Sequence, residues 1–396
     1  MEKLRVGVIG LGHRGLSLLE ALLIYVKDIE ISALCDVYED RVEAARKVVE
    51  DAGGKKPFTT LNYKEIIDDK KADCVLIITP WKLHVEMSLY CMEKGMPVGI
   101  EVCGANTLEE CFALVETYER TKTPFMFLEN CCYGRRELMI LNMVKQGVFG
   151  EVIHCDGGYM HDLRDEIAFG KENRHYRLEE YSTRNRENYP THELGPIAKI
   201  LDINNGNRFV SLVSMSSKAA GLHEFILQNK ADDKELVNRV FPQGDVVSTI
   251  IKCARGETIN LMLDTTLPRW YSRGFTVRGT KAVYTEDNDS LLFDNNEEHR
   301  KQHFCWKNQW GNADEFLEQY EHPIWKKYIE DGVVGGHDGI DYLVYTEFFN
   351  CVRDGKPMPL DVYDAAAWMS ISPLSEMSIK NGGAPVEVPD FQHLSK

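Results

Sequence analysis

Residues able to transfer protons are concentrated in one stretch of the sequence, between positions 159 and 192. The stretch contains tyrosines, histidines, arginines and an aspartate, at Tyr159, His161, Asp162, Arg164, His175, Arg177, Tyr189 and His192. Histidine and tyrosine are natural proton-transfer groups, and loops above a rigid sheet are where active sites form. We therefore expect a catalytic site here, the alternative being a solvated surface on which a residue such as His175 is simply exposed.

A second chemical signature is the pattern Gly-x-Gly-x-x-Gly at residues 10–15, which follows a strand-like run and opens a helix-like one. That context is typical of a dinucleotide-binding turn, whose three glycines allow a tight turn, close approach of a pyrophosphate and close packing of helix on strand. They are Gly10, Gly12 and Gly15. Asp36 ends the second strand, 26 residues after Gly10, and suits the ribose hydroxyls. No arginine directly follows Asp36, so the pattern favours NAD over NADP.

Polar residues also stand at the carboxyl ends of the next three predicted strands. Residues 79–84 end the third strand, residues 101–102 the fourth, and residues 129–130 the fifth. In a parallel sheet these ends line the ligand crevice. We therefore expect their side chains to face the cofactor, the alternative being that Trp81 and His84 only cap a helix.

The elements that must position these residues change in type near residue 130. Before it, continuous apolar strands alternate with helices, which predicts a Rossmann doubly wound parallel sheet in an NAD-binding domain of residues 1–130. After it, strands alternate with a period near two, which predicts a substrate-binding α+β domain of residues 131–396 with an open, mainly antiparallel sheet. Late helices are predicted at 342–353 and 362–378, packed on that second sheet or on the domain joint, with a glycine-rich loop at 332–339.

Composition excludes several classes of partner. The 396 residues carry 46 basic and 62 acidic side chains, a formal charge of −16, which disfavours nucleic acid and anionic membranes. No apolar run approaches the ~20 residues of a membrane helix, and no basic, signal-like start is present, so we expect a cytoplasmic protein.

The eleven cysteines form no CxxC pair and are expected to be reduced. No metal site is expected, because no metal-ligating residues cluster at close spacing in the sequence.

The chain resembles the Gfo/Idh/MocA oxidoreductase superfamily, on the evidence of the glycine fingerprint and the antiparallel domain that follows it. Ordinary dehydrogenases of that superfamily carry Glu-Lys-Pro at the end of the fourth or fifth strand, with the lysine moving a proton. The matching run here is Glu101-Val102-Cys103. Valine cannot move a proton, so a simple alcohol dehydrogenase is disfavoured.

Longer runs resemble the glycoside hydrolases of family 109, which include NAD-dependent alpha-N-acetylgalactosaminidases. The similar runs are 79–84, 128–139, 158–164, 188–196 and 213–217. Two departures lie beside the expected sugar pocket. Glu193 follows His192 where the family usually has glycine, and Arg-Glu-Asn at 186–188 replaces a typical Gly-Asn-Leu. The resemblance therefore implies the type of reaction more firmly than the sugar or the anomer.

The resemblance also implies which residues contact the cofactor and which contact the substrate. Cofactor contacts are expected from the glycine turn, the strand ends and one later tyrosine, namely His13, Arg14, Asp36, Trp81, His84, Glu101, Val102, Asn130 and Tyr189. Substrate contacts are expected from Tyr159, Arg177, Tyr189, Pro190, Thr191, His192 and Tyr271. For Tyr271 a purely structural contact on the sheet is an equal alternative.

A conventional glycosidase uses two carboxylates, and no such pair stands out. The resemblance implies another route: oxidation at sugar C3, removal of the C2 proton, elimination at C1, addition of water and return of the hydride. We expect His192 to act as the base at the C3 hydroxyl and Tyr159, helped by His161, to handle the C2 proton, with Tyr189 beside the nicotinamide. The roles of His192 and Tyr159 could be exchanged.

Two other functions fit the same motifs. One is a net NAD-dependent sugar dehydrogenase or epimerase, which would accumulate NADH with free sugar. The other is a non-catalytic NAD-binding sensor or scaffold. In each case we expect a small molecule as the ligand, and the open sheet is a possible surface for a homo-oligomer.

Overall fold

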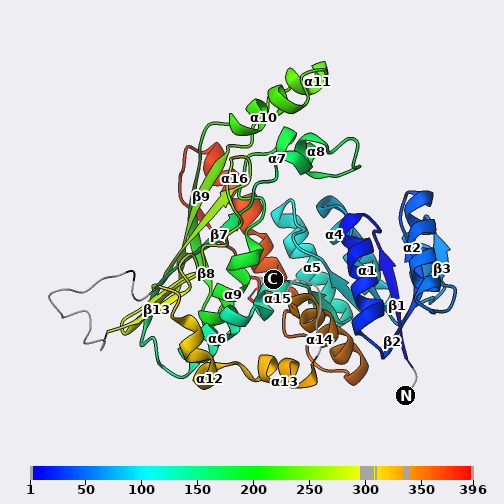
Figure 1. Cartoon of the computed structure of the whole chain (residues 1–396), viewed down its shortest axis with the longest axis horizontal. Coiled ribbons are helices and arrows are strands. Elements are labelled where there is room, and N and C mark those ends of the chain that lie inside the picture. Colours follow the sequence, from blue (N-terminus) through cyan, green and yellow to red (C-terminus); the bar gives the residue numbers. More distant parts are fainter. Residues whose placement is uncertain (1–2, 295–306, 308–309, 333–338, 394–396) are drawn as a thin grey trace. The chain divides into compact units, whose positions relative to one another are not determined.

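The computed structural model describes residues 3–294, 307, 310–332 and 339–393 (Figure 1). The expected glycine-rich loop at 332–339 lies mostly outside these residues. The chain forms two compact units, the first made of Met1–Tyr133 and Lys327–Met369, the second of Gly134–Lys326 and Ser370–Lys396. In the described part of the chain, no helix has the length and apolar character needed to cross a membrane.

The first unit contains a six-stranded parallel sheet with the strand order β3-β2-β1-β4-β5-β6. Its strands are β1 (Leu4–Ile9), β2 (Ile29–Cys35), β3 (Phe58–Thr60), β4 (Cys74–Ile77), β5 (Val98–Ile100) and β6 (Phe125–Phe127). Every residue of β4, β5 and β6 is buried, as in a sheet covered by helices on both faces. The predicted doubly wound Rossmann sheet is thus confirmed, and the strand order reverses between β1 and β4, where such folds bind ligands.

The helices of the first unit alternate with these strands. They are α1 (His13–Tyr25), α2 (Glu39–Asp51), α3 (Tyr63–Asp68), α4 (Trp81–Glu93) and α5 (Leu108–Thr121), followed by the 3₁₀ turn η1 (Asn130–Tyr133). Local sequence sets their ends: at α5, Thr107 Oγ1 accepts the Glu110 amide at 3.2 Å and the Glu110 carboxylate accepts the Thr107 amide at 3.1 Å. This reciprocal capping satisfies two amides that the helix itself leaves without partners.

Two late helices complete the first unit. α14 (Ile340–Asp354) packs on α1 and η1, and α15 (Val362–Met369) packs on α5 and β6, where Trp368 is fully buried against Phe127. The expectation of one continuous helix at 362–378 is wrong. α16 (Ile371–Lys380) is a separate helix that packs on β8 in the second unit. Pro373 explains the break, because proline has no amide hydrogen and its ring clashes with the carbonyl four residues earlier.

The second unit contains an eight-stranded sheet with the order β13-β12-β11-β7-β10-β9-β8-β14. The strands are β7 (Val152–Met160), β8 (Phe209–Ser216), β9 (Val246–Cys253), β10 (Thr258–Asp264), β11 (Thr276–Gly279), β12 (Ala282–Thr285), β13 (Ser290–Phe293) and β14 (Val386–Glu387). All neighbouring pairs are antiparallel except β7 with β10. The predicted mainly antiparallel sheet is confirmed.

Helices cover one face of this second sheet. α9 (Thr191–Ile200) packs on β7 and α16 packs on β8, while α6 (Arg135–Lys145) packs on α9 (Figure 1). Burial alternates along β9, with Ile251 buried and its neighbours Ile250 and Lys252 exposed. Short helices fill the connections: α7 (Arg164–Ala168), α8 (Arg177–Thr183), α10 (Gly221–Asn229), α11 (Lys234–Val237), η4 (Ala313–Phe316), α12 (Leu317–Tyr320) and α13 (Pro323–Asp331).

Candidate active site

The glycine turn between β1 and α1 follows the backbone path that its sequence predicts. Gly10 has a left-handed φ of +97°, and a Cβ there would lie 2.3 Å from the carbonyl oxygen of Ile78. A Cβ on Gly15 would lie 2.0 Å from the carbonyl oxygen of Gly10. Helix α1 begins directly after Gly12, and its first amides have no carbonyl partners within the helix. The turn is therefore a tight cradle at a helix N-terminus, which fits the pyrophosphate of a dinucleotide.

Asp36 lies directly after β2 and is held against the glycine turn. Its Oδ2 accepts the Leu11 amide at 2.7 Å and its Oδ1 accepts the Tyr38 amide at 3.0 Å. A carboxylate has further lone pairs, which suit the hydroxyls of a ribose. Arg41, which no sequence motif indicates, places Nη1 3.9 Å from Asp36 Oδ2.

Trp81 and His84, on the first turn of α4, use their polar atoms on backbone carbonyls. The Trp81 indole donates to the Val102 carbonyl at 3.2 Å. The two ring nitrogens of His84 lie 2.6 Å from the Cys103 carbonyl oxygen and 2.7 Å from that of Thr79. Burial lowers the pKa of His84, although both carbonyls favour the protonated ring. These side chains fix the backbone that follows β5, and their contact with a cofactor stays a prediction.

Three other predicted cofactor residues belong to one polar network. Arg14 donates to Glu101 at 2.8 Å, and Arg14 and Asn130 both donate to Asp341. His13, beside Arg14 at the start of α1, is exposed. Asp341 was not predicted from the sequence, and no local pattern points to it, because it lies 211 residues after Asn130.

In the second unit, two hydroxyl–imidazole pairs join the four predicted catalytic residues. The Tyr159 hydroxyl lies 3.0 Å from Nδ1 of His161, and the Tyr189 hydroxyl lies 3.3 Å from Nε2 of His192. The rings of Tyr159 and Tyr189 are 4.2 Å apart between centroids and stack with a tilt of 31°. The two pairs therefore form one cluster in which protons can pass between oxygen and nitrogen.

Tyr271 joins the same cluster from the loop after β10. Its ring stands edge-on to His161 at 5.3 Å and to Tyr159 at 6.3 Å, measured between centroids. Half of the Tyr271 side chain is exposed. Tyr271 therefore presents an exposed aromatic ring beside the proton-transfer groups, and its contact with substrate stays a prediction.

Arg177, the first residue of α8, places a cation beside the cluster. Its guanidinium carbon is 5.3 Å from the Tyr189 ring and 5.9 Å from the Tyr159 ring. Glu166 pairs with Arg177 Nε at 2.7 Å. Burial lowers the pKa of His161, and the positive charge of Arg177 lowers it further. The His161 ring is therefore neutral, and able to accept a proton, down to a lower pH than an exposed histidine.

The two remaining predicted substrate residues, Pro190 and Thr191, begin α9. Pro190 is the residue before the helix and Thr191 its first residue, and both are buried. Their order brings Tyr189 and His192 onto the same side of the helix start, as the contact between those two rings at 4.7 Å shows. Pro190 and Thr191 therefore set the geometry of the cluster, while their contact with substrate stays a prediction.

Glu193, the first departure from the family pattern, is fully buried on α9. A Cβ on Gly157 of β7 would lie 2.3 Å from Cγ of Glu193, so only glycine fits there. The Glu193 carboxylate lies 3.7 Å from Nη1 of Arg273, whose guanidinium also pairs with Glu137 of α6 and, at 3.8 Å, with Glu286. Arg273, two residues after Tyr271 in the same loop, thus connects that loop to Glu193, the residue after His192.

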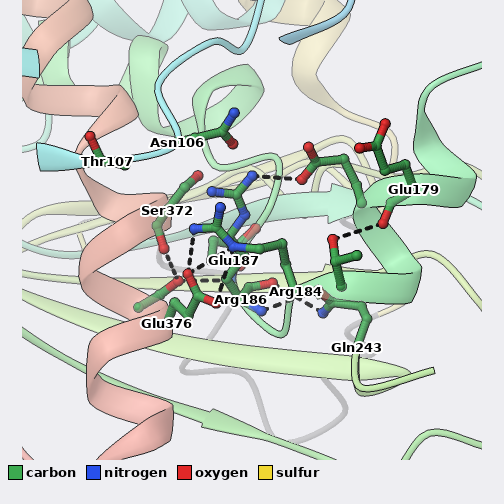
Figure 2. A network of polar contacts seen from close by, with 12 residues as sticks. Asn106, Thr107, Glu179, Arg184, Arg186, Glu187, Gln243, Ser372 and Glu376 are labelled. Atoms are coloured by element: carbon green, nitrogen blue, oxygen red, sulfur yellow. Dashed lines mark hydrogen bonds and ion pairs between the residues drawn. The ribbon is translucent and has the colours of Figure 1, made fainter. Parts of the chain in front are cut away.

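The second departure, residues 186–188, is anchored at several points (Figure 2). Arg186 donates to Glu180 of α8 at 2.8 Å, and its backbone amide donates to the Gln243 side chain at 3.1 Å. Arg184 donates to Glu376 of α16 at 3.0 Å. Residues 186–188 directly precede the turn that carries Tyr189 and His192. The contacts of Arg184 and Arg186 therefore also hold that turn in place.

Glu187 is the least expected member of that segment. Its side chain is fully buried, and its backbone amide donates to Ser375 Oγ at 2.8 Å. Burial raises the pKa of Glu187 to about 8, partly offset by the backbone amide of Tyr189. From the sequence, Glu187 is recognisable only as a departure from the family pattern, because nothing in its local sequence predicts its burial.

Similarity to known protein families and solved structures first defines the class of protein. Residues 4–128 match the description "Oxidoreductase family, NAD-binding Rossmann fold". Among solved structures, levoglucosan dehydrogenase in complex with NADH and levoglucosan has a TM-score of 0.69 and 18% identity, covering 98% of this chain and all of that one. A myo-inositol 2-dehydrogenase from Lactobacillus plantarum has a TM-score of 0.67 and 16% identity, with coverage of 98% and 100%. At these identities the likeness concerns the fold alone.

The particular family follows from the second unit and from the whole chain. Residues 133–395 match the description "Glycosyl hydrolase 109, C-terminal domain". A glycosyl hydrolase family 109 protein of Parabacteroides distasonis is 38% identical over 98% of this chain and 87% of its own length. An alpha-N-acetylgalactosaminidase of Tannerella forsythia is 37% identical, with coverage of 98% and 86%. The chain belongs to glycosyl hydrolase family 109, and is a glycosidase built on an NAD-binding oxidoreductase fold.

Proposed function

We propose that this protein cleaves an alpha-N-acetylgalactosaminide or a related glycoside, using NAD that it retains from one turnover to the next. The observation that carries the proposal is the pairing of Tyr159 with His161 and of Tyr189 with His192 in one cluster. A glycosidase that first oxidises its substrate needs two proton-transfer groups rather than two carboxylates. The printed name of the Tannerella forsythia relative supports the choice of sugar.

Each residue then has a defined chemical role. NAD⁺, when bound, supplies reversible removal of a hydride from sugar C3. His192 accepts the proton of the C3 hydroxyl. Tyr159 passes its phenolic proton to neutral His161, and the phenolate takes the C2 proton, which is acidic once C3 is a ketone. The C1 substituent then leaves and is protonated, through solvent, by the proton that His161 took up. Water adds its hydroxyl at C1, Tyr159 returns a proton to C2, and the remaining proton of that water restores the phenol. His192 returns its proton to the C3 oxygen as the hydride returns to C3. A positioned base of this kind contributes about 10²–10⁴ in rate.

The choice of NAD over NADP rests on Asp36. Its carboxylate faces the glycine turn through the Leu11 amide, where a 2′-phosphate would meet a negative charge. The nearby Arg41 pairs with Asp36 at 3.9 Å, which reduces its capacity to attract that phosphate. Titration of the protein with NADH and NADPH, followed by nicotinamide fluorescence, tests the preference; tighter binding of NADPH would contradict it.

The function is tested with a panel of alpha and beta nitrophenyl glycosides incubated in D₂O. We expect release of nitrophenol, deuterium at sugar C2 by NMR, and no net NADH. Accumulation of NADH with free sugar would instead identify a sugar dehydrogenase or epimerase. Cleavage that continues at full rate after all NAD has been removed would overturn the proposal.

A further inference from the structure

The guanidinium of Arg14, on the first turn of α1, lies between two carboxylates. It donates to Glu101 Oε1 from Nη2 at 2.8 Å and from Nε at 3.2 Å. It also donates to both oxygens of Asp341, from Nη1 at 2.8 Å and from Nη2 at 2.9 Å. The Asp341 contact has the bidentate geometry of a strong, charge-assisted pair.

Two neutral side chains complete this group, which we term the Arg14 network: Arg14, Glu101, Asn130, Asp341 and Tyr345. Asn130 donates to Asp341 Oδ1 at 2.8 Å and Tyr345 donates to Glu101 Oε1 at 2.5 Å. Burial, and then the charge of Glu101, raise the pKa of Tyr345, so its phenol keeps the proton that it donates. Glu101 Oε1 thus accepts from three donor atoms and is an anchor rather than a base.

The network joins residues from four places in the first unit. Arg14 lies in the glycine turn, between Gly12 and Gly15, Glu101 follows β5, Asn130 follows β6, and Asp341 and Tyr345 lie on α14. The four partners of Arg14 are buried, with exposed fractions of 7% for Glu101, 7% for Asn130, 4% for Asp341 and 0% for Tyr345, while the Arg14 side chain is 31% exposed. Buried charges hold a fixed geometry only when every partner is present, because removing one leaves another uncompensated.

We infer that Asp341 and Tyr345 are positioning residues of the dinucleotide site, and that α14 acts through them to slow release of the cofactor. Arg14, Glu101 and Asn130 are the residues expected to contact the dinucleotide, and α14 holds all three in place. This inference rests on the proposed function in one respect only, namely that the bound cofactor is a nicotinamide dinucleotide. A glycosidase that takes its hydride back at every turnover has no need to exchange NAD, so slow release suits its chemistry.

The test compares Asp341→Asn and Tyr345→Phe with a control variant that removes a different contact of α14. Asp28→Asn removes the ion pair of Asp28, between α1 and β2, with Arg353 of α14, which lies outside the Arg14 network. Each full-length variant is loaded with NADH and diluted, and loss of bound-nicotinamide fluorescence gives the dissociation rate. We expect the rate to rise about tenfold or more in both network variants and to change less than about twofold in the control.

Several outcomes would overturn the inference. Unchanged dissociation in both folded network variants would do so, as would an equal rise in the control. Circular dichroism checks folding, and if Asp341→Asn does not fold, the milder Tyr345→Phe decides. The readout is independent of catalysis, so a protein that retains NADH but cleaves no glycoside refutes the proposed function and leaves this inference intact.

Discussion

The hydroxyl of Tyr159 lies 3.0 Å from Nδ1 of His161, and His161 lies beside the cation of Arg177 in a half-buried position. Burial first, and then the Arg177 charge, lower the pKa of His161. The ordinary pKa of histidine is about 6.5. The neutral His161 ring, which can accept the Tyr159 proton, therefore persists to a lower pH than that.

This relationship predicts the pH dependence of turnover. In the wild type, kcat should fall only at a pH below the ordinary histidine value, because the neutral form of His161 must be present. In His161→Gln we expect kcat to be reduced about 10²-fold or more and this acid limb to move. Initial rates on a nitrophenyl glycoside from pH 4 to pH 8 measure it. His223→Gln, at an exposed position on α10, is the matched control. An acid limb that is unchanged in His161→Gln would refute the role of His161.

The roles of Tyr159 and His192 predict different partial reactions. Tyr159→Phe should still oxidise the sugar but fail to remove the C2 proton, so enzyme-bound NADH accumulates without deuterium at C2. His192→Ala should show little NADH, with kcat lowered about 10²–10⁴-fold. Stopped-flow absorbance of bound NADH, together with NMR in D₂O, separates the two. If the phenotypes are reversed, the two residues exchange roles.

Glu187 predicts a pH-dependent stability. Burial raises its folded-state pKa to about 8, whereas an unfolded glutamate titrates near pH 4.3. Between those values the folded protein holds a proton that the unfolded chain has lost. The contribution of Glu187 to stability is therefore full below about pH 4 and falls as pH rises to about 8, by at most about 1.4 kcal/mol per pH unit.

Glu187→Gln should remove that dependence, because an amide does not titrate. Relative to the wild type, its free energy of unfolding should increase steadily as pH is raised from 5 to 8. Urea unfolding at each pH gives the comparison, and Glu179→Gln, at an exposed position on α8, is the control. A constant difference between wild type and Glu187→Gln across this range would show that the carboxyl is not buried as described.

The group around Arg273 predicts an asymmetric response to mutation. Arg273→Met leaves three carboxylates, Glu137, Glu193 and Glu286, without their shared cation, and should cost about 3–5 kcal/mol of stability. Glu193→Gln removes one of three negative charges and should cost much less. Its effect should appear in KM, because Glu193 adjoins His192. Guanidinium unfolding and steady-state kinetics measure both, and equal destabilisation by the two variants would contradict the prediction.

Much of the cofactor half could be predicted from sequence because its signals are local. The turn at residues 10–15 and Asp36 after β2 depend on neighbouring residues, whose order along the chain fixes their place at strand ends. Each follows a strand that is recognisable in the sequence as an apolar run, so its position is predicted from that run. The same holds for the mainly antiparallel second sheet, whose strands alternate in burial.

Contacts between distant segments could not be predicted. Asp341 and Tyr345 lie on an ordinary amphipathic helix, and nothing near them in sequence points to Glu101, 244 residues before Tyr345. Likewise, the burial of Glu187 depends on α16, and that of Glu193 on a glycine in β7. Buried charges of this kind depend on tertiary packing between distant segments. A residue pattern within one segment cannot predict that packing.

The first unit is assembled from two stretches separated by nearly two hundred residues, Met1–Tyr133 and Lys327–Met369. During translation the glycine turn is therefore made long before α14 (Ile340–Asp354). Asp341 and Tyr345 can join Arg14 and Glu101 only after the whole intervening segment, which belongs to the second unit, has been synthesised. If α14 holds the dinucleotide in place, firm loading must wait for that segment, and chains terminated before α14 should lose their NAD.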